Sequence, residues 1–171
     1  TYDNMGRRTA VTDPLGHITT TSYDLGGQVV SIQNALGYIT SYQYDLDGNQ
    51  TTVTDANGKV TTSVFSGTSN RLSASVDSNG LRTTFTYDLA GQQTAIQDAR
   101  GNSTTFTYDN AGRVQTQKNA VGNVTTHLYD LAGRNTTLID ALGNVRTMTY
   151  DALSRKVTVQ YANGNRLTMQ Y

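Results

Sequence analysis

Apolar and polar residues alternate along this chain in short stretches that glycine-bearing turns separate. In one stretch Thr104, Phe106 and Tyr108 take alternate positions, with Thr105 and Thr107 between them. A period of two sends alternate side chains to opposite faces of a β-strand, so one face would be apolar and the other polar. No stretch between turns reaches the ~10–12 residues that would distinguish a helix. The preceding strands carry one equivalent apolar slot, occupied by Val11, Ile32, Val53, Ile96, Leu138 and Val159.

Two kinds of turn alternate with these strands. The first kind reads Tyr108-Asp109-Asn110-Ala111-Gly112-Arg113 or Tyr129-Asp130-Leu131-Ala132-Gly133-Arg134, and the second reads Asp98-Ala99-Arg100-Gly101-Asn102 or Asp140-Ala141-Leu142-Gly143-Asn144. In both kinds an Asp or Asn stands three residues before Gly, so its side chain can bind the backbone of the bend. We therefore predict that Gly112 and Gly133 close their turns at positive φ.

The turns recur at a fixed period, marked by tyrosine. Every step between markers is 21 residues except Phe65 to Tyr87, which is 22. The pattern predicts a single array over residues 1–171, with eight repeats of two strands and two turns. Such an array is all-β, a single extended antiparallel sheet of up to sixteen short strands, curled because strands twist. The repeats begin at Tyr2, Tyr23, Tyr44, Phe65, Tyr87, Tyr108, Tyr129 and Tyr150, and Tyr171 continues the register.

Two repeats depart from the pattern. In the fourth, Phe65-Ser66-Gly67-Thr68-Ser69-Asn70-Arg71 replaces the Tyr-Asp turn and adds a residue, so we expect a longer loop or a bulge there before sheet pairing resumes. In the eighth, Ser154 replaces the usual Gly and Tyr161 the usual Asp or Asn. Neither end shows a distinct capping repeat, which a soluble array needs. We therefore expect this chain to be a segment of a longer polypeptide.

Composition fits an ordered sheet better than the alternatives. Leu, Ile, Val and Phe make up about a fifth of the chain, but thirteen Lys and Arg balance thirteen acidic residues, so self-repulsion does not favour disorder. Thr, with 29 copies, suits half-exposed strands. Without a basic block, nucleic acid is an unfavourable partner. Cysteine is absent, and no apolar stretch approaches the length of a membrane span.

The pattern Tyr-Asp-x-x-Gly-Arg, followed by a strand and then Asp-x-x-Gly-Asn-x-Thr, resembles the Rhs or YD-repeat family over the whole chain. That family includes bacterial Rhs and polymorphic toxins, toxin-complex cocoon subunits and the animal teneurins. The resemblance implies a β-ribbon that winds into a hollow shell around a toxic cargo, in a secreted or surface-delivered bacterial protein. The family's closing segment with its self-cleavage site and its variable effector domain have no match in this sequence. We expect the partners to be other segments of the parent polypeptide and its enclosed effector domain.

The sequence offers little support for an enzyme, a metal site or a cofactor. Glu is absent, and twelve of the thirteen Asp recur at the two turn positions, with Asp47 the exception. Residues at fixed repeat positions indicate turn chemistry before catalysis. Stacked turns could align carboxylates for calcium, but each turn supplies a single one. His17 and His127 occupy different repeat positions without a neighbouring His or Cys, and no Gly-x-Ser-x-Gly elbow exists. We predict no catalytic, cofactor or metal residues.

The column of marker tyrosines allows two interpretations. It could form a carbohydrate-binding platform, since an aromatic face beside a carboxylate suits a sugar ring, or it could be a cross-strand ladder that locks the register. We favour the ladder. The arginines Arg7, Arg113, Arg134 and Arg155 repeat one slot and are expected to pair with turn aspartates. The predicted structural markers are Tyr2, Tyr23, Tyr44, Tyr87, Tyr108, Tyr129, Tyr150, Gly112 and Gly133.

These residues predict a structural segment of a shell or scaffold that encloses or presents an effector domain. The alternative is a carbohydrate-binding or cell-surface adhesion module, with glycans as partners. The isolated chain would leave an apolar stripe around Ile32, Val53, Ile96 and Leu138 short of cover, so self-association is expected.

Overall fold

The computed structural model describes residues 1–67 and 69–171 as strands joined by turns, and it assigns no helix to them. The all-β prediction is therefore confirmed. The sixteen strands are β1 (Ala10–Thr12), β2 (Ile18–Tyr23), β3 (Val29–Gln33), β4 (Ile39–Tyr44), β5 (Gln50–Thr54), β6 (Val60–Phe65), β7 (Leu72–Val76), β8 (Arg82–Tyr87), β9 (Gln93–Gln97), β10 (Ser103–Tyr108), β11 (Val114–Lys118), β12 (Val124–Tyr129), β13 (Asn135–Ile139), β14 (Val145–Tyr150), β15 (Lys156–Gln160) and β16 (Arg166–Thr168).

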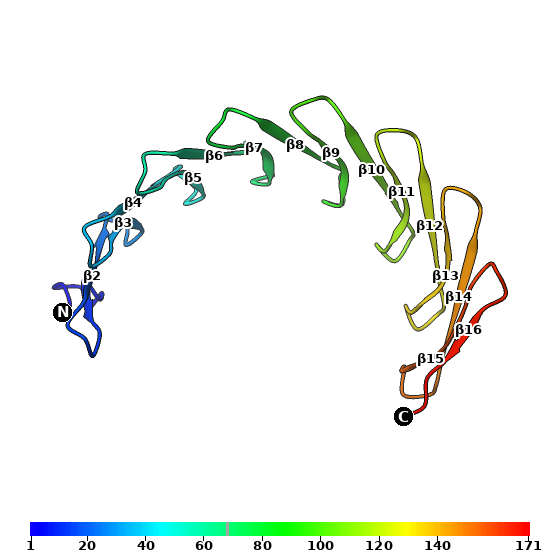
Figure 1. Ribbon diagram of the computed structural model, residues 1–171. Helices are drawn as coiled ribbons and strands as arrows, with labels where there is room; N and C mark the ends of the chain where they lie inside the picture. The colour runs from blue at the N-terminus through cyan, green and yellow to red at the C-terminus, as the bar shows by residue number, and fades with distance from the viewer. Residues whose placement is uncertain (68) are drawn as a thin grey trace. The chain divides into compact units, whose positions relative to one another are not determined.

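The strands form one antiparallel sheet in which each strand lies beside its neighbours in the sequence, from β1 to β16 (Figure 1). This order follows from the tight turns, because a short connection can only join antiparallel neighbours. Residue contacts divide the chain into two compact units, Thr1–Thr84 and Phe85–Tyr171, with the boundary inside β8. We call them the N-terminal and C-terminal units.

A β-bulge recurs where a first turn joins two strands. Thr107 pairs with Thr116, but Tyr108 pairs with Val114, so Gln115 is the extra residue on β11. The same shift occurs at the first turns after Tyr23, Tyr44, Phe65, Tyr129 and Tyr150. Each bulge re-aims the chain next to the marker residue.

Glycine takes the left-handed conformation in the turns, as predicted: φ is 78° at Gly112 and 82° at Gly133. In the eighth repeat Ser154 adopts the same conformation, with φ of 61°. In the fourth repeat Asn70 takes it, with φ of 51°. The turn there is longer by one residue: the Ser66 N–H donates to the Arg71 carbonyl, and pairing resumes between Phe65 and Leu72. Thr68, which belongs to the expected loop, lies outside the described residues.

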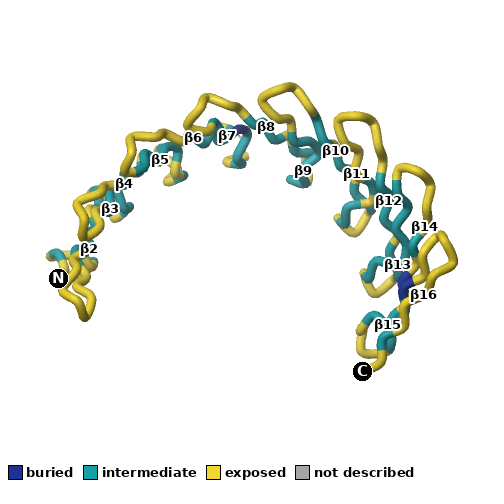
Figure 2. Tube along the Cα trace, viewed as in Figure 1, coloured by how far each residue is buried: buried dark blue, intermediate teal, exposed yellow. Residues whose placement is uncertain are grey.

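The two sheet faces differ much as the alternation predicts. Along β10, Thr104, Phe106 and Tyr108 are half-buried, whereas Thr105 and Thr107 are exposed. Full burial is rare, however, because a single layer has no second layer to cover it. Among described residues the buried apolar side chains are Ala74, Met148 and Val159 (Figure 2). Of the predicted apolar slot, Val159 is buried, Ile32, Val53, Ile96 and Leu138 are half-buried and Val11 is exposed.

Candidate functional site

Each first turn is built around its aspartate. In the turn after Tyr108, one carboxylate oxygen of Asp109 accepts the backbone N–H groups of Ala111 at 2.9 Å and Arg113 at 3.0 Å. The Gly112 N–H donates to the Asp109 carbonyl at 2.9 Å, and the Asp109 N–H donates to the Arg113 carbonyl at the same distance. This arrangement satisfies backbone groups that strand pairing cannot reach.

The arginine that ends the turn binds the second oxygen of the same aspartate. Arg113 Nε lies 2.7 Å and Nη2 2.6 Å from Asp109 Oδ2, so the pair is two-pronged. The side-chain and backbone hydrogen bonds from Arg113 lower the pKa of the Asp109 carboxyl below its ordinary value. Equivalent pairs confirm the sequence expectation for these arginines: Arg7 with Asp3, Arg134 with Asp130 and Arg155 with Asp151.

The same arginine also reaches the next repeat. The guanidinium of Arg113 lies over the ring of Tyr129, 4.5 Å from its centroid, and Nη1 donates to the Asp130 carbonyl at 3.2 Å. Arg134 repeats both contacts on Tyr150 and Asp151. A guanidinium over an aromatic face is a favourable cation–π arrangement, and its planar fork can bind a carboxylate at the same time. The further ring contacts are Arg7 over Tyr23 at 4.7 Å and Arg155 over Tyr171 at 4.7 Å.

The marker tyrosine closes the link with its hydroxyl, which donates to a main-chain carbonyl fifteen residues earlier. Tyr129 binds the carbonyl of Val114 at 2.9 Å, so the end of β12 is tied to the start of β11. We call the arginine contacts and this tyrosine bond together the turn clamp. The other hydroxyl bonds run from Tyr23 to Arg8, Tyr44 to Val29, Tyr108 to Gln93, Tyr150 to Asn135 and Tyr171 to Lys156.

The two further predicted markers are Tyr2 and Tyr87. Tyr2 is exposed and forms an isolated bridge with Arg8. Tyr87 ends β8 and is half-buried. The remaining predicted markers, Tyr23, Tyr44, Tyr108, Tyr129 and Tyr150, each form the hydroxyl bond described above.

The sequence interpretation of the tyrosines needs correction in one respect. Where their ring contacts are recorded, the rings of Tyr23, Tyr129 and Tyr150 meet the arginine of the preceding repeat rather than another marker tyrosine. One ring face is thereby occupied, which removes part of the open platform that a sugar would need. The signal for this contact was in the sequence: arginine precedes the marker tyrosine by sixteen residues at each of these sites.

The second turns that begin with aspartate use it in the same way, but the residue after their glycine is not arginine. Asp98 accepts the side-chain amide of Asn102 at 2.9 Å and its backbone N–H at 2.8 Å, and these bonds lower the pKa of the carboxyl. His17 takes the equivalent place beside Asp13, with Nδ1 2.9 Å from Oδ2. His127 instead accepts a bond from the Asn135 amide at 3.0 Å and stacks near Tyr129.

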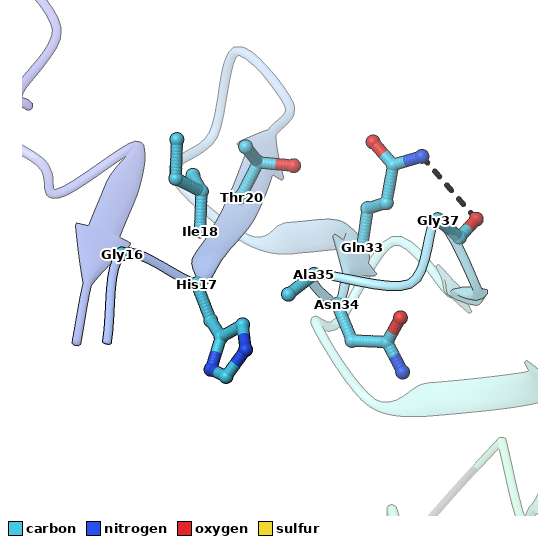
Figure 3. Close-up of a pocket in the computed structure, with 8 residues that line it drawn as sticks. All are labelled: Gly16, His17, Ile18, Thr20, Gln33, Asn34, Ala35 and Gly37. Carbon is cyan, nitrogen blue, oxygen red and sulfur yellow. Dashed lines mark hydrogen bonds between the residues drawn. The ribbon is translucent and has the colours of Figure 1, made fainter. Parts of the chain in front are cut away.

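A shallow groove of about 390 Å³ lies between two successive second turns (Figure 3). Its walls come from Gly16, Ile18 and Thr20 on one side and from Asn34 and Ala35 on the other. The lining also includes His17 and Gln33, but no carboxylate side chain. Within residues 1–67 and 69–171, no cluster of three or more metal-ligating side chains occurs. None of the described residues forms a helix long and apolar enough to cross a membrane.

Comparison with solved structures identifies the fold. The chain resembles a TcdB2-TccC3-Cdc42 crystal structure with a TM-score of 0.74 at 18% identity, covering 90% of this chain and 9% of that one. It resembles TcdB2-TccC3 with a TM-score of 0.62 at 16% identity, covering 98% and 12%. A Tc holotoxin pore of Photorhabdus luminescens matches with a TM-score of 0.60 at 19% identity, covering 98% and 9%. The chain thus spans about a tenth of the chains it matches.

Comparison with curated protein sequences gives no match. Two family models do match the sequence. The RHS Repeat model covers residues 129–166, which include the complete first turn after Tyr129. The model of the Teneurin YD-shell covers residues 1–147, most of the chain and seven of the marker positions. Together with the clamped turns and the sequential sheet, this match shows that the chain belongs to the teneurin YD-shell family.

Proposed function

We propose that this chain is a wall segment of a YD-type shell and that its role is structural, without catalysis. The observation that most supports this proposal is the single-layer sheet of sixteen strands, in which very few described side chains are fully buried. A layer with two accessible faces suits a wall between two compartments, because neither face is buried in a hydrophobic core within the same segment. The aspartates at the two repeated turn positions bind the backbone of their turns, as Asp109 and Asp140 do, which gives these carboxylates a structural role.

The enclosed object would be an effector domain of the parent polypeptide. The support is family membership together with the likeness in fold to TcdB2-TccC3 chains. The same membership supports secretion or display at a cell surface. The partners of this segment would then be neighbouring parts of the same polypeptide, which would cover the half-buried face.

The test uses the parent polypeptide at its natural length. Electron cryomicroscopy should place residues 1–171 in a wall, and a protease added outside should spare a second domain until the wall is unfolded with denaturant. A structure in which this segment encloses no space, or equal digestion of every domain in the native protein, would refute the proposal.

A further inference from the structure

The residue that ends each first turn decides how strongly one repeat is fastened to the next. Where it is arginine, as at Arg113, it binds its own aspartate, the next tyrosine ring and the next turn's carbonyl. Gln28 retains a single link to the next turn, from its amide to the Gly48 carbonyl at 3.4 Å. Asn49 is shorter: its amide binds Asp45 at 2.9 Å, and its one link to the next first turn is a hydrogen bond to the side chain of Asn70. A neutral amide offers neither a cation for a ring nor the reach of a guanidinium.

The tyrosine hydroxyl bond of the clamp is also missing at the junction that follows Asn49, because the side chain there has no hydroxyl. Fifteen residues after Gln50, the place of the marker tyrosine is taken by Phe65, which has no hydroxyl to donate. In the matching position of the C-terminal unit, the Tyr129 hydroxyl binds Val114 and ties β12 to β11. Asn49 and Phe65 therefore weaken both parts of one clamp, and both lie in the N-terminal unit.

An arginine stacked on the marker ring and a tyrosine hydroxyl bond, which Asn49 and Phe65 cannot supply, would brace the same place in the sheet. Gln50 begins β5 and Phe65 ends β6, so they lie at the end of this hairpin that is remote from its connecting turn at Asp55–Gly58. Recorded pairing of the two strands ends at Thr52 and Thr62. The corresponding pairing of β11 with β12 ends at Thr116 and Thr126, but there the clamp secures the strand ends beyond it. Gln50 still pairs with Tyr44 and Phe65 with Leu72, so what these two strand ends lack is a link to one another. Local opening occurs where such contacts are few.

We propose that the β5–β6 boundary is a built-in opening seam, where the ribbon separates before its other hairpins do. The seam arises from two substitutions that act together, asparagine for arginine and phenylalanine for tyrosine. Its existence depends on the clamp geometry alone and so goes beyond the wall function. The longer turn that follows Phe65 places an extra residue at the same junction.

Hydrogen–deuterium exchange on the complete chain tests the seam, followed by mass spectrometry of peptides from each hairpin. Amides of β5 and β6 should exchange roughly tenfold faster than those of β11 and β12, because one hydrogen bond or one cation–π contact shifts an opening equilibrium by about that factor. Phe65→Tyr, alone and with Asn49→Arg, should slow exchange in β5 and β6 and leave β11 and β12 unchanged.

The matched variants move the seam to the C-terminal unit. Tyr129→Phe removes only an oxygen atom, and Arg113→Asn copies the residue found at Asn49. Each should speed exchange in β11 and β12 and spare β5 and β6, with circular dichroism confirming an intact sheet. Equal exchange of the two hairpins in the unaltered chain would overturn the proposal. So would Phe65→Tyr without a local slowing, even if Tyr129→Phe weakens its own hairpin.

Discussion

The aspartate carboxylates of the turns accept backbone hydrogen bonds in their charged form. Hydrogen bonds from Arg113 lower the pKa of Asp109, and the backbone bond from Arg155 is the largest cause of the lowered pKa at Asp151. Protonation of either group would weaken the acceptor that holds the bend. The aspartates with lowered pKa are Asp3, Asp13, Asp45, Asp98, Asp109, Asp130, Asp140 and Asp151.

Acid should therefore destabilise the sheet. A carboxyl group whose pKa is lower in the folded chain stabilises the fold at pH values above its unfolded pKa, and this contribution is lost as the pH falls through the folded pKa. We expect the urea midpoint of unfolding to hold from neutral pH to about pH 5 and to fall as the pH drops below the ordinary carboxyl value of 3.8. The Asp109→Asn variant, which keeps an acceptor oxygen, should show a shallower decline. A midpoint independent of pH across this range would contradict the assignment.

The backbone of Ser154 is strained, and a substitution could relieve this strain. Its φ of 61° lies in the left-handed region, which glycine adopts at the equivalent place in other repeats. We predict that Ser154→Gly stabilises the chain by up to ~1 kcal/mol, with the weak contact between Arg134 and the Ser154 hydroxyl as the small loss. Thermal unfolding measures the change. Ser31→Gly, in the middle of β3, is the control and should lower the melting temperature.

Among the elements, the strands and turns were the most predictable. Alternation along β10 and the Asp-x-x-Gly spacing depend on residues a few positions apart, so the sequence alone shows them. The bulge at Tyr108 depends on the register of strands already paired, and no local pattern states that register. The contact between Arg113 and Tyr129 joins residues sixteen positions apart, so its signal shows only when whole repeats are compared. The position of one fully buried residue was also missed: Ala74, unremarkable in the sequence, has 0% of its surface exposed.

The glycines of the first turns offer a direct test of the hairpins. A Cβ at Gly112 would lie 2.9 Å from the Gln92 amide, and at Gly133 it would lie 3.7 Å from Arg113 Nη1. We predict that Gly112→Val and Gly133→Val each cost more than ~1 kcal/mol of unfolding free energy, because a β-branched residue is strained at positive φ. Gly67→Ala is the control, since Gly67 lacks a positive φ and its added Cβ would meet nothing within 4 Å. Unchanged melting of both valine variants would refute this account of the turns.

At the scale of the whole chain, much apolar surface faces water. Leucines at one first-turn position are almost completely exposed, namely Leu25, Leu46, Leu89 and Leu131. In addition, β1 and β16 are the two outermost strands of the sheet that the described residues form. Unpaired strand edges and repeated apolar tips both favour association.

We therefore predict that the isolated chain self-associates, with a mass by light scattering above 18.5 kDa that increases with concentration. A variant with Leu89→Asn and Leu131→Asn should associate less, because Asn110 already occupies that turn position in the repeat between them. Circular dichroism would check that the variant keeps its strands. A monomer at every concentration would mean that the exposed tips and edges do not drive association.

The turn clamp has a consequence for how such a chain can change in length. Its hydroxyl bonds span fifteen residues and its arginine-to-carbonyl bonds span seventeen, so each clamp joins adjacent repeats. Contact order in such a chain stays low however many copies are added. Gain or loss of a whole 21-residue copy by recombination would remake one junction of the same kind, whereas a partial copy would break the spacing between arginine and tyrosine. Lengths should therefore vary among relatives in whole steps of the repeat.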